Sequence, residues 1–288
     1  MAADADDVVR RPLRCELSNY TLLDAAGTLH SVPARWRDLT AGVEELPGGI
    51  VVALEAMTAA LGRAGGDGTD LTSLVAGPYR TLVERCDAAG AESPFLESFD
   101  EHAPIADALE TCEELLSASA RLVAREVVSP MAGVLAHLNV SDGGVPKRAL
   151  DTARIDASGV VGDAQRARQH HGRPSQALSI WSTERIEALQ SEGHPVTPGA
   201  AGENLTVSDL DWGRVRPGVR LVIGSDPEHA VVAEVTWWAE PCRTIAGCFS
   251  DRRYSRIGAS KHPGWSRAYA AVLRGGEVRA GDRVAVRV

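Results

Sequence analysis

The feature that most constrains this chain of 288 residues is a change in its apolar pattern near residue 129. Before that point apolar residues recur at helical spacing, as in Ile105, Leu109, Cys112 and Leu116. After it come short runs rich in Val, Thr and Trp, separated by Gly and Pro turn signals. A chain of this length can bury two cores. We therefore predict an α+β protein in which an all-α helical bundle, residues 1–128, precedes a mostly β, barrel-like domain, residues 129–288.

Four amphipathic segments support the helical bundle, and they lie at residues 31–39, 50–61, 75–86 and 105–123. The opening stretch, residues 14–29, weakly resembles the start of DinB-like four-helix bundle proteins, a family that often carries a metal held by histidines. This half contains only His30 and His102, so that histidine set is absent. The resemblance therefore implies a docking module or a dimerisation module, and in the second case the protein would be a homodimer.

The composition of the chain restricts the classes of partner that the protein is expected to bind. The formal net charge of −9 argues against binding to nucleic acid or to an anionic membrane surface, although a local basic site for one anionic ligand remains open. The five cysteines are odd in number and form no CxxC pair, which favours neither a disulfide framework nor a zinc ribbon. The N-terminus is acidic where a signal peptide would be basic, and no apolar run is long enough to cross a bilayer. We expect a cytoplasmic protein.

Within the second half, strands are expected over residues 133–140, 177–181, 219–224, 230–238 and 283–288. One helix, residues 182–191, is expected to begin at Ser182 or Thr183 as N-cap. Residues 216–219 fit a type II turn with Pro217 and Gly218 at its centre. The turn signals at residues 275–276 and 280–282 are predicted to close two further hairpins.

Cys242 is the candidate reactive residue. The preceding strand should stop at Pro241, because proline cannot donate to a sheet ladder, and a thiol at a strand end is held but reachable. The guanidinium of Arg243 would favour the thiolate. The alternative is that Cys242 is a small buried hydrophobe. Trp237 and Trp238 should face opposite ways on a regular strand, one toward the core and one toward the mouth of a pocket.

Six motifs follow in order: Gly162-Asp163, His170-His171-Gly172, Gly202-Glu203-Asn204-Leu205, Glu240-Pro241-Cys242, His262-Pro263-Gly264-Trp265 and the segment 276–282. Together they resemble the MOSC domain family, named for the C-terminal domain of molybdenum cofactor sulfurases, over residues 131–288. The resemblance implies a barrel-like β fold and a role with the molybdenum cofactor (molybdopterin). It also implies that Cys242 bears sulfur, or is a metal ligand if molybdenum is bound.

The remaining candidate site residues have plain structural alternatives. His170 and His171 could donate to a ligand oxygen or take the proton of Cys242, or one of them could simply cap a turn. Gly202, Glu203 and Asn204 suit the edge of a heterocyclic cofactor, but Glu and Asn also satisfy loop backbone groups.

Arg243 is a candidate for binding the cofactor through an anionic group. Cys248 could resolve a persulfide on Cys242 or be buried by packing. Many MOSC members carry an Arg where this chain has Ala239, a second Gly where it has Arg173, and another Arg where it has Ala271.

Three functions follow. The first is a sulfur carrier or sulfur transferase that binds the cofactor, supplied by a sulfur donor such as a cysteine desulfurase, since no pyridoxal-phosphate domain is evident. The second is a molybdenum-cofactor-dependent oxidoreductase that reduces N-hydroxylated compounds with a redox partner. The third is a non-catalytic ligand-binding or adaptor protein.

Overall fold

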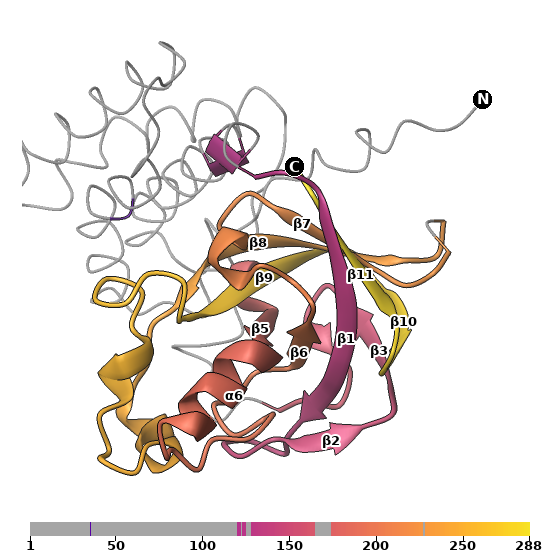
Figure 1. Cartoon of the computed structure of the whole chain (residues 1–288). Coiled ribbons are helices and arrows are strands. Elements are labelled where there is room, and N and C mark those ends of the chain that lie inside the picture. The colour runs from indigo at the N-terminus through magenta and orange to yellow at the C-terminus, as the bar shows by residue number, and fades with distance from the viewer. Residues whose placement is uncertain (1–34, 36–119, 122, 125–127, 165–173, 227) are drawn as a thin grey trace, which may run out of the picture. The chain divides into compact units, whose positions relative to one another are not determined.

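The computed structural model describes residues 35, 120–121, 123–124, 128–164, 174–226 and 228–288 (Figure 1). The helical bundle expected over residues 1–128 falls almost entirely outside these ranges and stays a prediction. The same holds for the division of the chain into two domains. Among the described residues, no helix is long and apolar enough to cross a membrane.

Seven of the described strands close a barrel (Figure 1). They are β1 (Met131–Val140), β5 (Leu178–Ser182), β6 (Leu205–Ser208), β7 (Arg220–Ile223), β8 (Val231–Ala239), β9 (Arg267–Arg274) and β11 (Arg283–Arg287). Around the barrel the order is β1, β11, β7, β8, β9, β5, β6, and β6 pairs with β1 to complete the ring. The short strand β2 (Arg148–Leu150) extends one end of β1. The predicted strands and the barrel-like fold are therefore confirmed.

A second sheet contains β3 (Thr152–Asp156), β4 (Gly159–Val160) and β10 (Gly276–Arg279). The two hairpins predicted at residues 275–276 and 280–282 are wrong, because β10 pairs with β3 and not with β9 or β11. At these turns the chain leaves the barrel and then returns to it. Gly275 permits the exit, since a Cβ there would lie 2.5 Å from the carbonyl oxygen of Ile155.

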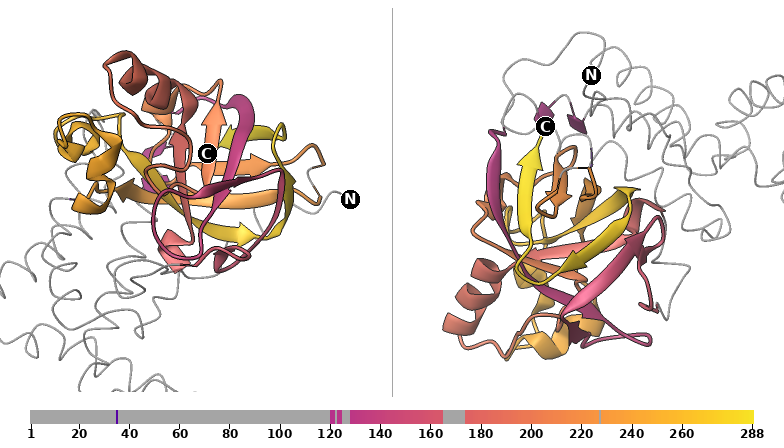
Figure 2. Two further views of the ribbon diagram at one scale, coloured as in Figure 1. Left: turned by 90° about the horizontal axis from the view of Figure 1, so that it is seen from below. Right: turned by 90° about the vertical axis from the view of Figure 1, so that its right-hand side faces the viewer.

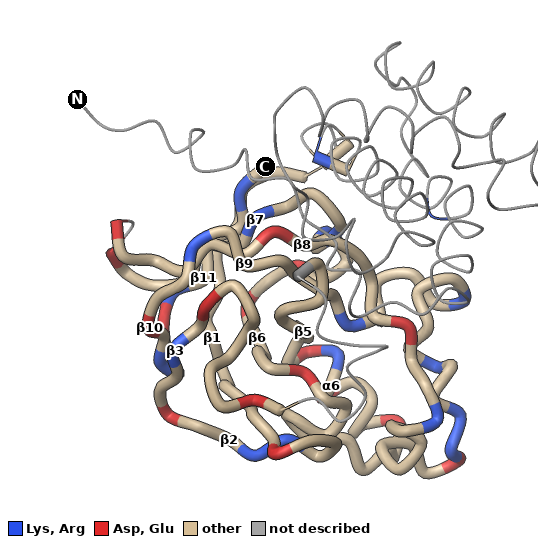
Figure 3. Tube along the Cα trace, turned by 180° about the vertical axis from the view of Figure 1, so that it is seen from behind, with Lys and Arg blue, Asp and Glu red and all other residues tan. Residues whose placement is uncertain are grey.

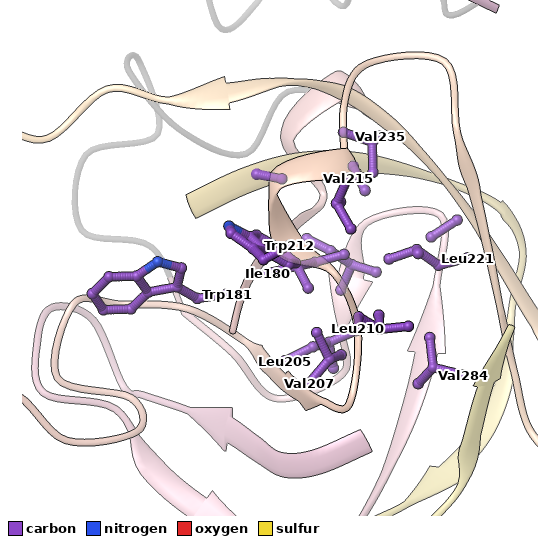
Figure 4. Close-up of a cluster of buried hydrophobic side chains, with 14 of the residues drawn as sticks. Ile180, Trp181, Leu205, Val207, Leu210, Trp212, Val215, Leu221, Val235 and Val284 are labelled. Atoms are coloured by element: carbon purple, nitrogen blue, oxygen red, sulfur yellow. The ribbon is translucent and has the colours of Figure 1, made fainter. Parts of the chain in front are cut away.

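The barrel interior is filled by apolar side chains from facing strands (Figure 4). Those drawn there include Ile180, Leu205, Val207, Leu221, Val235 and Val284, all fully buried. On β11, Val284 and Val286 are buried while Arg283 and Arg287 are exposed, as expected of a half-buried strand, but Val288 lies past the end of the strand and is exposed.

The parallel pair β5–β6 needs a crossover, and α6 (Thr183–Ser191) provides it. Ser182 is the N-cap, and its Oγ accepts a hydrogen bond from the backbone N–H of Arg185 at 3.2 Å. In the predicted type II turn, Gly218 has φ +91° and the N–H of Val219 donates to the carbonyl of Arg216.

Four short 3-10 segments complete the described part: η3 (Pro174–Gln176), η4 (Trp212–Arg214), η5 (Arg243–Cys248) and η6 (Tyr254–Ile257). Figure 2 shows α6 and the excursion that contains η5 and η6 on the same side of the barrel. Arg256 of η6 forms an ion pair with Glu192 at the end of α6, and its guanidinium lies 3.7 Å from the centre of the Trp265 ring. These contacts fix the excursion that follows Cys242.

Candidate functional site

Cys242 lies where β8 leaves the barrel. The strand ends at Ala239, before Pro241, as the sequence predicted, and Cys242 is the N-cap residue of η5. Its thiol is free and exposed, and Arg243 beside it is exposed as well. The alternative of a buried, packed cysteine therefore does not apply to Cys242.

The two tryptophans before Cys242 do not divide between core and surface as predicted. The register of β8 against β9 shifts between Val235 and Trp237, so Thr236 is an extra, bulged residue. Trp237 and Trp238 are both half-buried, and their rings meet edge to face with centroids 5.0 Å apart. Trp237 and Trp238 themselves pair with the consecutive residues Tyr269 and Ala268, so the bulge precedes both, and neither ring is fully buried in the core.

Cys248, at the other end of η5, is buried. Its thiol donates to the carbonyl of Ala200 at 3.2 Å. Burial, assisted by the nearby carboxyl of Glu203, raises the pKa of Cys248 to about 11. Cys248 therefore stays a neutral thiol near neutral pH, as the packing alternative expected.

Asn204 forms hydrogen bonds to two strands of the barrel and to one loop. Its backbone N–H donates to the carbonyl of Ser179 at 2.7 Å, and its side-chain oxygen accepts from the N–H of Ser179 at 3.2 Å. The side-chain amide donates to Oδ2 of Asp163 at 2.9 Å and to the carbonyl of Asn139 at 3.4 Å. Asn204 therefore links β1, β5 and the loop that contains Asp163.

Asp163 is the second centre of this network. Its carboxylate accepts from the backbone N–H of Ser141 at 2.7 Å, from Asn204 and from the ammonium of Lys147. The side chains of Lys147 and Asp163 are only 8% and 5% exposed, so this ion pair is shielded from solvent. Burial lowers the pKa of Lys147, while the contact with Asp163 opposes that shift.

Glu203 is fully buried. Its Oε1 accepts from the backbone N–H of Gly199 at 2.6 Å and from the hydroxyl of Thr206 at 3.5 Å. Within the described residues, Oε2 meets no hydrogen-bond donor. Burial raises the pKa of Glu203, and the nearby cations Arg267 and Lys147 oppose the rise. The chain thus keeps a buried carboxyl group with one free oxygen.

Arg267 borders this cluster from β9, the strand that pairs with β8. It pairs with Ala239, the last residue of β8, which precedes Cys242 by three positions. A Cβ on Gly202 would lie 3.8 Å from the guanidinium of Arg267 and 2.9 Å from a methyl group of Val145. With φ +87°, Gly202 is therefore needed for the backbone conformation and for the close contact with Val145, whereas Arg267 lies at an ordinary van der Waals distance.

His170 and His171 lie outside the described residues, as do Arg166, Arg168 and Arg173. The described ends of their segment are both anchored. Ala164 exchanges hydrogen bonds with Ser141 beside the Asp163 network, and the carbonyl of Ser175 accepts from the hydroxyl of Thr236 on β8.

The sequence singled out Cys242, Arg243, Gly202, Glu203 and Asn204, whose roles in a site stay predictions. It did not single out three residues that contact or border Gly202 and Asn204 or their partners: Lys147, Asp163 and Arg267. Asp163 stood in a quoted motif and could have been tested as a site residue. Nothing in the sequence marks Lys147 or Arg267 as buried. Ala239 and Ala271 are buried in the barrel, so Arg267 supplies the buried guanidinium near the position of Ala239.

No group of three or more His, Cys, Asp or Glu side chains that could hold a metal ion occurs among the described residues. The described part contains an exposed thiol just after β8 and a buried set of hydrogen-bonding groups around Glu203.

Comparison with known proteins finds one family model that matches part of this region. The family model of the MOSC domain matches residues 167–285, which confirms the predicted resemblance. No curated protein matches the chain.

Solved structures provide remote likenesses. YuaD from Bacillus subtilis is 20% identical over 55% of this chain and 97% of its own, with a TM-score of 0.42. YiiM from Geobacillus stearothermophilus is 20% identical over 54% of this chain and 75% of its own, with a TM-score of 0.43. YiiM from Escherichia coli is 18% identical over 55% and 70%, with a TM-score of 0.41.

Proposed function

We propose, from the MOSC domain at residues 167–285, that this protein acts with the molybdenum cofactor and that Cys242 carries sulfur or contacts the cofactor. The observation that carries the proposal is the exposed thiol of Cys242 at the end of β8. Three positions before it, Ala239 pairs with Arg267, whose guanidinium borders the buried cluster around Glu203. To act on a bound ligand, a protein needs a nucleophile that the ligand can reach. It also needs polar groups, such as those around Glu203, that are already in place to bind it.

The donor set of the described residues fits the cofactor. A pterin ring has N–H donors and a carbonyl acceptor, and the cluster has unused acceptors on Glu203 and Asn139 and an unused donor on Arg267. The thiolate of Cys242 is a ligand that soft metal centres accept, and Arg243 is an exposed cation suited to a phosphate. When bound, the cofactor supplies two-electron chemistry at molybdenum.

The chain's own residues would hold and orient the ligand. The Asn204–Asp163–Lys147 network fixes the turn that carries Glu203 against β1 and β5. Rigid support of this kind keeps hydrogen-bonding groups in place without reorganisation when a ligand arrives. His170 and His171 remain proposed proton carriers for the Cys242 thiol.

For sulfur transfer, the Cys242 thiolate would attack the outer sulfur of a persulfide on a donor such as a cysteine desulfurase. A new S–S bond forms on Cys242, the S–S bond of the donor breaks, and the donor cysteine leaves as a thiolate. Sulfur and electrons balance in this exchange, so no oxidant or reductant is required. The product is a persulfide on Cys242, ready for a cofactor.

A reductase of N-hydroxylated compounds is the second candidate, and the charge distribution favours it. Residues 129–288 contain 20 Lys and Arg against 17 Asp and Glu, so the negative net charge of the chain arises in residues 1–128. The excursion after Cys242 exposes Arg243, Arg252, Arg253 and Lys261, and Figure 3 shows the Lys and Arg positions along the trace. A basic surface beside the reactive turn suits a redox partner with an acidic face.

Two measurements on the full chain separate the candidates. The protein is incubated with a cysteine desulfurase and L-cysteine, and the mass of the peptide that contains Cys242 is measured by mass spectrometry. Sulfur transfer predicts a gain of one sulfur atom in the wild type and in Cys248→Ser, and none at position 242 in Cys242→Ser.

Protein produced in a host that makes the cofactor is then supplied with a reductant and an N-hydroxylated base. The reductase predicts formation of the amine, with loss of activity in Cys242→Ala and retention in Cys248→Ala. A protein that forms neither the persulfide nor the amine, with Cys242→Ala behaving as the wild type, would contradict both and leave a ligand-binding or adaptor protein.

A further inference from the structure

Residues 240–242 carry the exposed thiol out of the barrel. β8 ends at Ala239, and Glu240, Pro241 and Cys242 are each at least partly exposed. The carbonyl of Cys242 accepts a hydrogen bond from the backbone N–H of Ile245 at 3.2 Å, at the start of η5. The direction in which the thiol points therefore depends on what holds residues 239–241.

The far end of the same excursion, residues 240–266 between β8 and β9, lies against this peptide at two points. The hydroxyl of Ser266 lies 3.0 Å from the carbonyl oxygen of Ala239, a hydrogen-bond distance. A Cβ built on Gly258 would lie 3.7 Å from the carboxylate of Glu240 and 3.7 Å from the ring of Pro241. The chain that follows η6 is thus the neighbour of the chain that precedes Cys242.

Trp265 and Ser266 are themselves tied to buried residues. The carbonyl of Trp265 accepts from the indole N–H of Trp181 at 3.0 Å, and Trp181 is fully buried on β5. The carbonyl of Ser266 accepts from the indole N–H of Trp212 at 2.9 Å. These two backbone contacts fix the point from which Ser266 reaches the end of β8.

Arg256 joins this point to α6. Its guanidinium lies 3.7 Å from the centre of the Trp265 ring and donates to both carboxylate oxygens of Glu192, the C-cap residue of α6. The same contact holds the pKa of Glu192 below its ordinary value, so its carboxylate is ionised at neutral pH. A two-point ion pair and a stacked tryptophan together define one orientation of Arg256, two residues before Gly258.

The exposure of this contact decides what it can do. The side chains of Arg256 and Glu192 are 24% and 39% exposed. Ion pairs with so much access to solvent contribute little to the stability of a whole domain. The buried core, which includes Ile257 and Phe249 of the excursion, holds the fold together without them. The effect of the pair is therefore expected in the local geometry of the excursion.

We propose that Arg256 is a positioning residue that, through Trp265, fixes the direction in which the thiol of Cys242 meets a sulfur donor. This inference rests on the proposed sulfur-carrying role of Cys242. In that exchange the donor S–S bond breaks as the new S–S bond forms, so the attacking thiolate must lie in line with the bond that breaks. A thiol on a loosely held peptide meets this condition less often.

The test compares two reactions of Cys242 in the full-length protein. The first is persulfide formation with a cysteine desulfurase and L-cysteine, and the second is alkylation by iodoacetamide. The variants are Arg256→Gln, Arg256→Lys and Glu192→Gln. Arg253→Gln is the matched control, because it removes the same charge from an exposed position of the same excursion. Thermal unfolding checks that each variant is folded.

Arg256→Gln should slow persulfide formation about tenfold or more, because the aligned approach is lost. Its alkylation rate should stay within about twofold of the wild type, because a small reagent needs only an exposed thiolate. Arg256→Lys should recover part of the loss, since its charge still faces Glu192 but cannot stack as a flat guanidinium does. Glu192→Gln should fall between the wild type and Arg256→Gln, and it decides the question if Arg256→Gln does not fold.

The control excludes a general effect of charge on the approach of the desulfurase. Arg253→Gln should form the persulfide at the wild-type rate. An equal loss in Arg253→Gln and Arg256→Gln would overturn the proposal, and so would a parallel fall of alkylation and persulfide formation in Arg256→Gln.

Hydrogen exchange separates this proposal from the function on which it rests. The backbone N–H groups of residues 242–245 should exchange about tenfold faster in Arg256→Gln than in the wild type and Arg253→Gln. Unchanged exchange would show that Arg256 does not hold this turn. A wild type that forms no persulfide would contradict the sulfur-carrier function, while faster exchange in Arg256→Gln would still support the hold of Arg256 on the turn.

Discussion

The turn at Cys242 and the cluster around Glu203 belong to one region of the fold but differ in every physical respect. Cys242, Arg243 and Thr244 are exposed, whereas Glu203 and Asn204 are buried and hydrogen-bonded to strands on both sides. The contrast indicates that the two regions have different roles. A nucleophile must be reachable by its reagent, while recognition groups gain strength from being fixed and shielded from water.

The 3-10 segment η5 connects the two regions. Cys242 precedes it and is exposed, and Cys248 ends it in contact with the carbonyl of Ala200 beside Glu203. Two thiols six positions apart in sequence therefore have opposite environments. This pair offers the simplest means of testing the comparison.

The largest expected effect is in thiol reactivity. At pH 8, iodoacetamide should modify Cys242 at least about 100-fold faster than Cys248, because only the thiolate reacts and access is required. Cys248 has a pKa raised to about 11 and is 6% exposed. Peptide mass spectrometry over a time course measures both rates in one sample. Similar rates for the two cysteines would show that the two regions do not differ as described.

A smaller effect is expected from Gly202→Ala, which should lower the free energy of unfolding in urea by about 1–3 kcal/mol. The added methyl group meets Val145 at 2.9 Å in a backbone conformation with φ +87°. Gly162→Ala has the same φ and no atom within 4 Å, so it should cost less and report the backbone strain alone.

Gly247→Ala completes this series. It has neither a positive φ nor a nearby atom, and should change the free energy of unfolding by less than about 0.5 kcal/mol. Equal losses in Gly202→Ala and Gly162→Ala would mean that the turn around Glu203 is not closely packed.

The smallest effect is the pH dependence of stability from Glu203. Burial raises the pKa of this carboxyl above its ordinary value of 4.5, so the folded state binds the proton more tightly than the unfolded state. Stability from this group is complete below pH 4.5 and is lost as pH rises through the folded pKa. The wild type should lose stability relative to Glu203→Gln over that interval, in urea unfolding at a series of pH values. A difference that is constant with pH would exclude a raised pKa.

Much of the barrel could be predicted because its signals are local. The alternation of Val284 and Val286 with exposed arginines marks β11, and Ser182 before an apolar helical pattern marks the start of α6. Strand pairing is not local. The glycines at residues 275–276 mark the place where the chain leaves β9, but which strand β10 pairs with depends on contacts with β3, far away in sequence.

The site shows the same limit. Cys242 was proposed because it follows a strand that was expected to stop at Pro241, and Glu203 and Asn204 were proposed from their motif. Lys147 and Arg267 are residue types that are usually exposed, and only the tertiary structure buries them beside Asp163 and Glu203. The bulge at Thr236 was also missed, because an irregularity of one residue leaves no periodic signal.

The most direct test of the proposed role is the molybdenum content of the full-length protein purified from a host that makes the cofactor. Elemental analysis should find stoichiometric molybdenum in the wild type and in Cys248→Ser, and a loss of most of it in Cys242→Ser. Wild-type protein without molybdenum, or Cys242→Ser with undiminished molybdenum, would contradict the account.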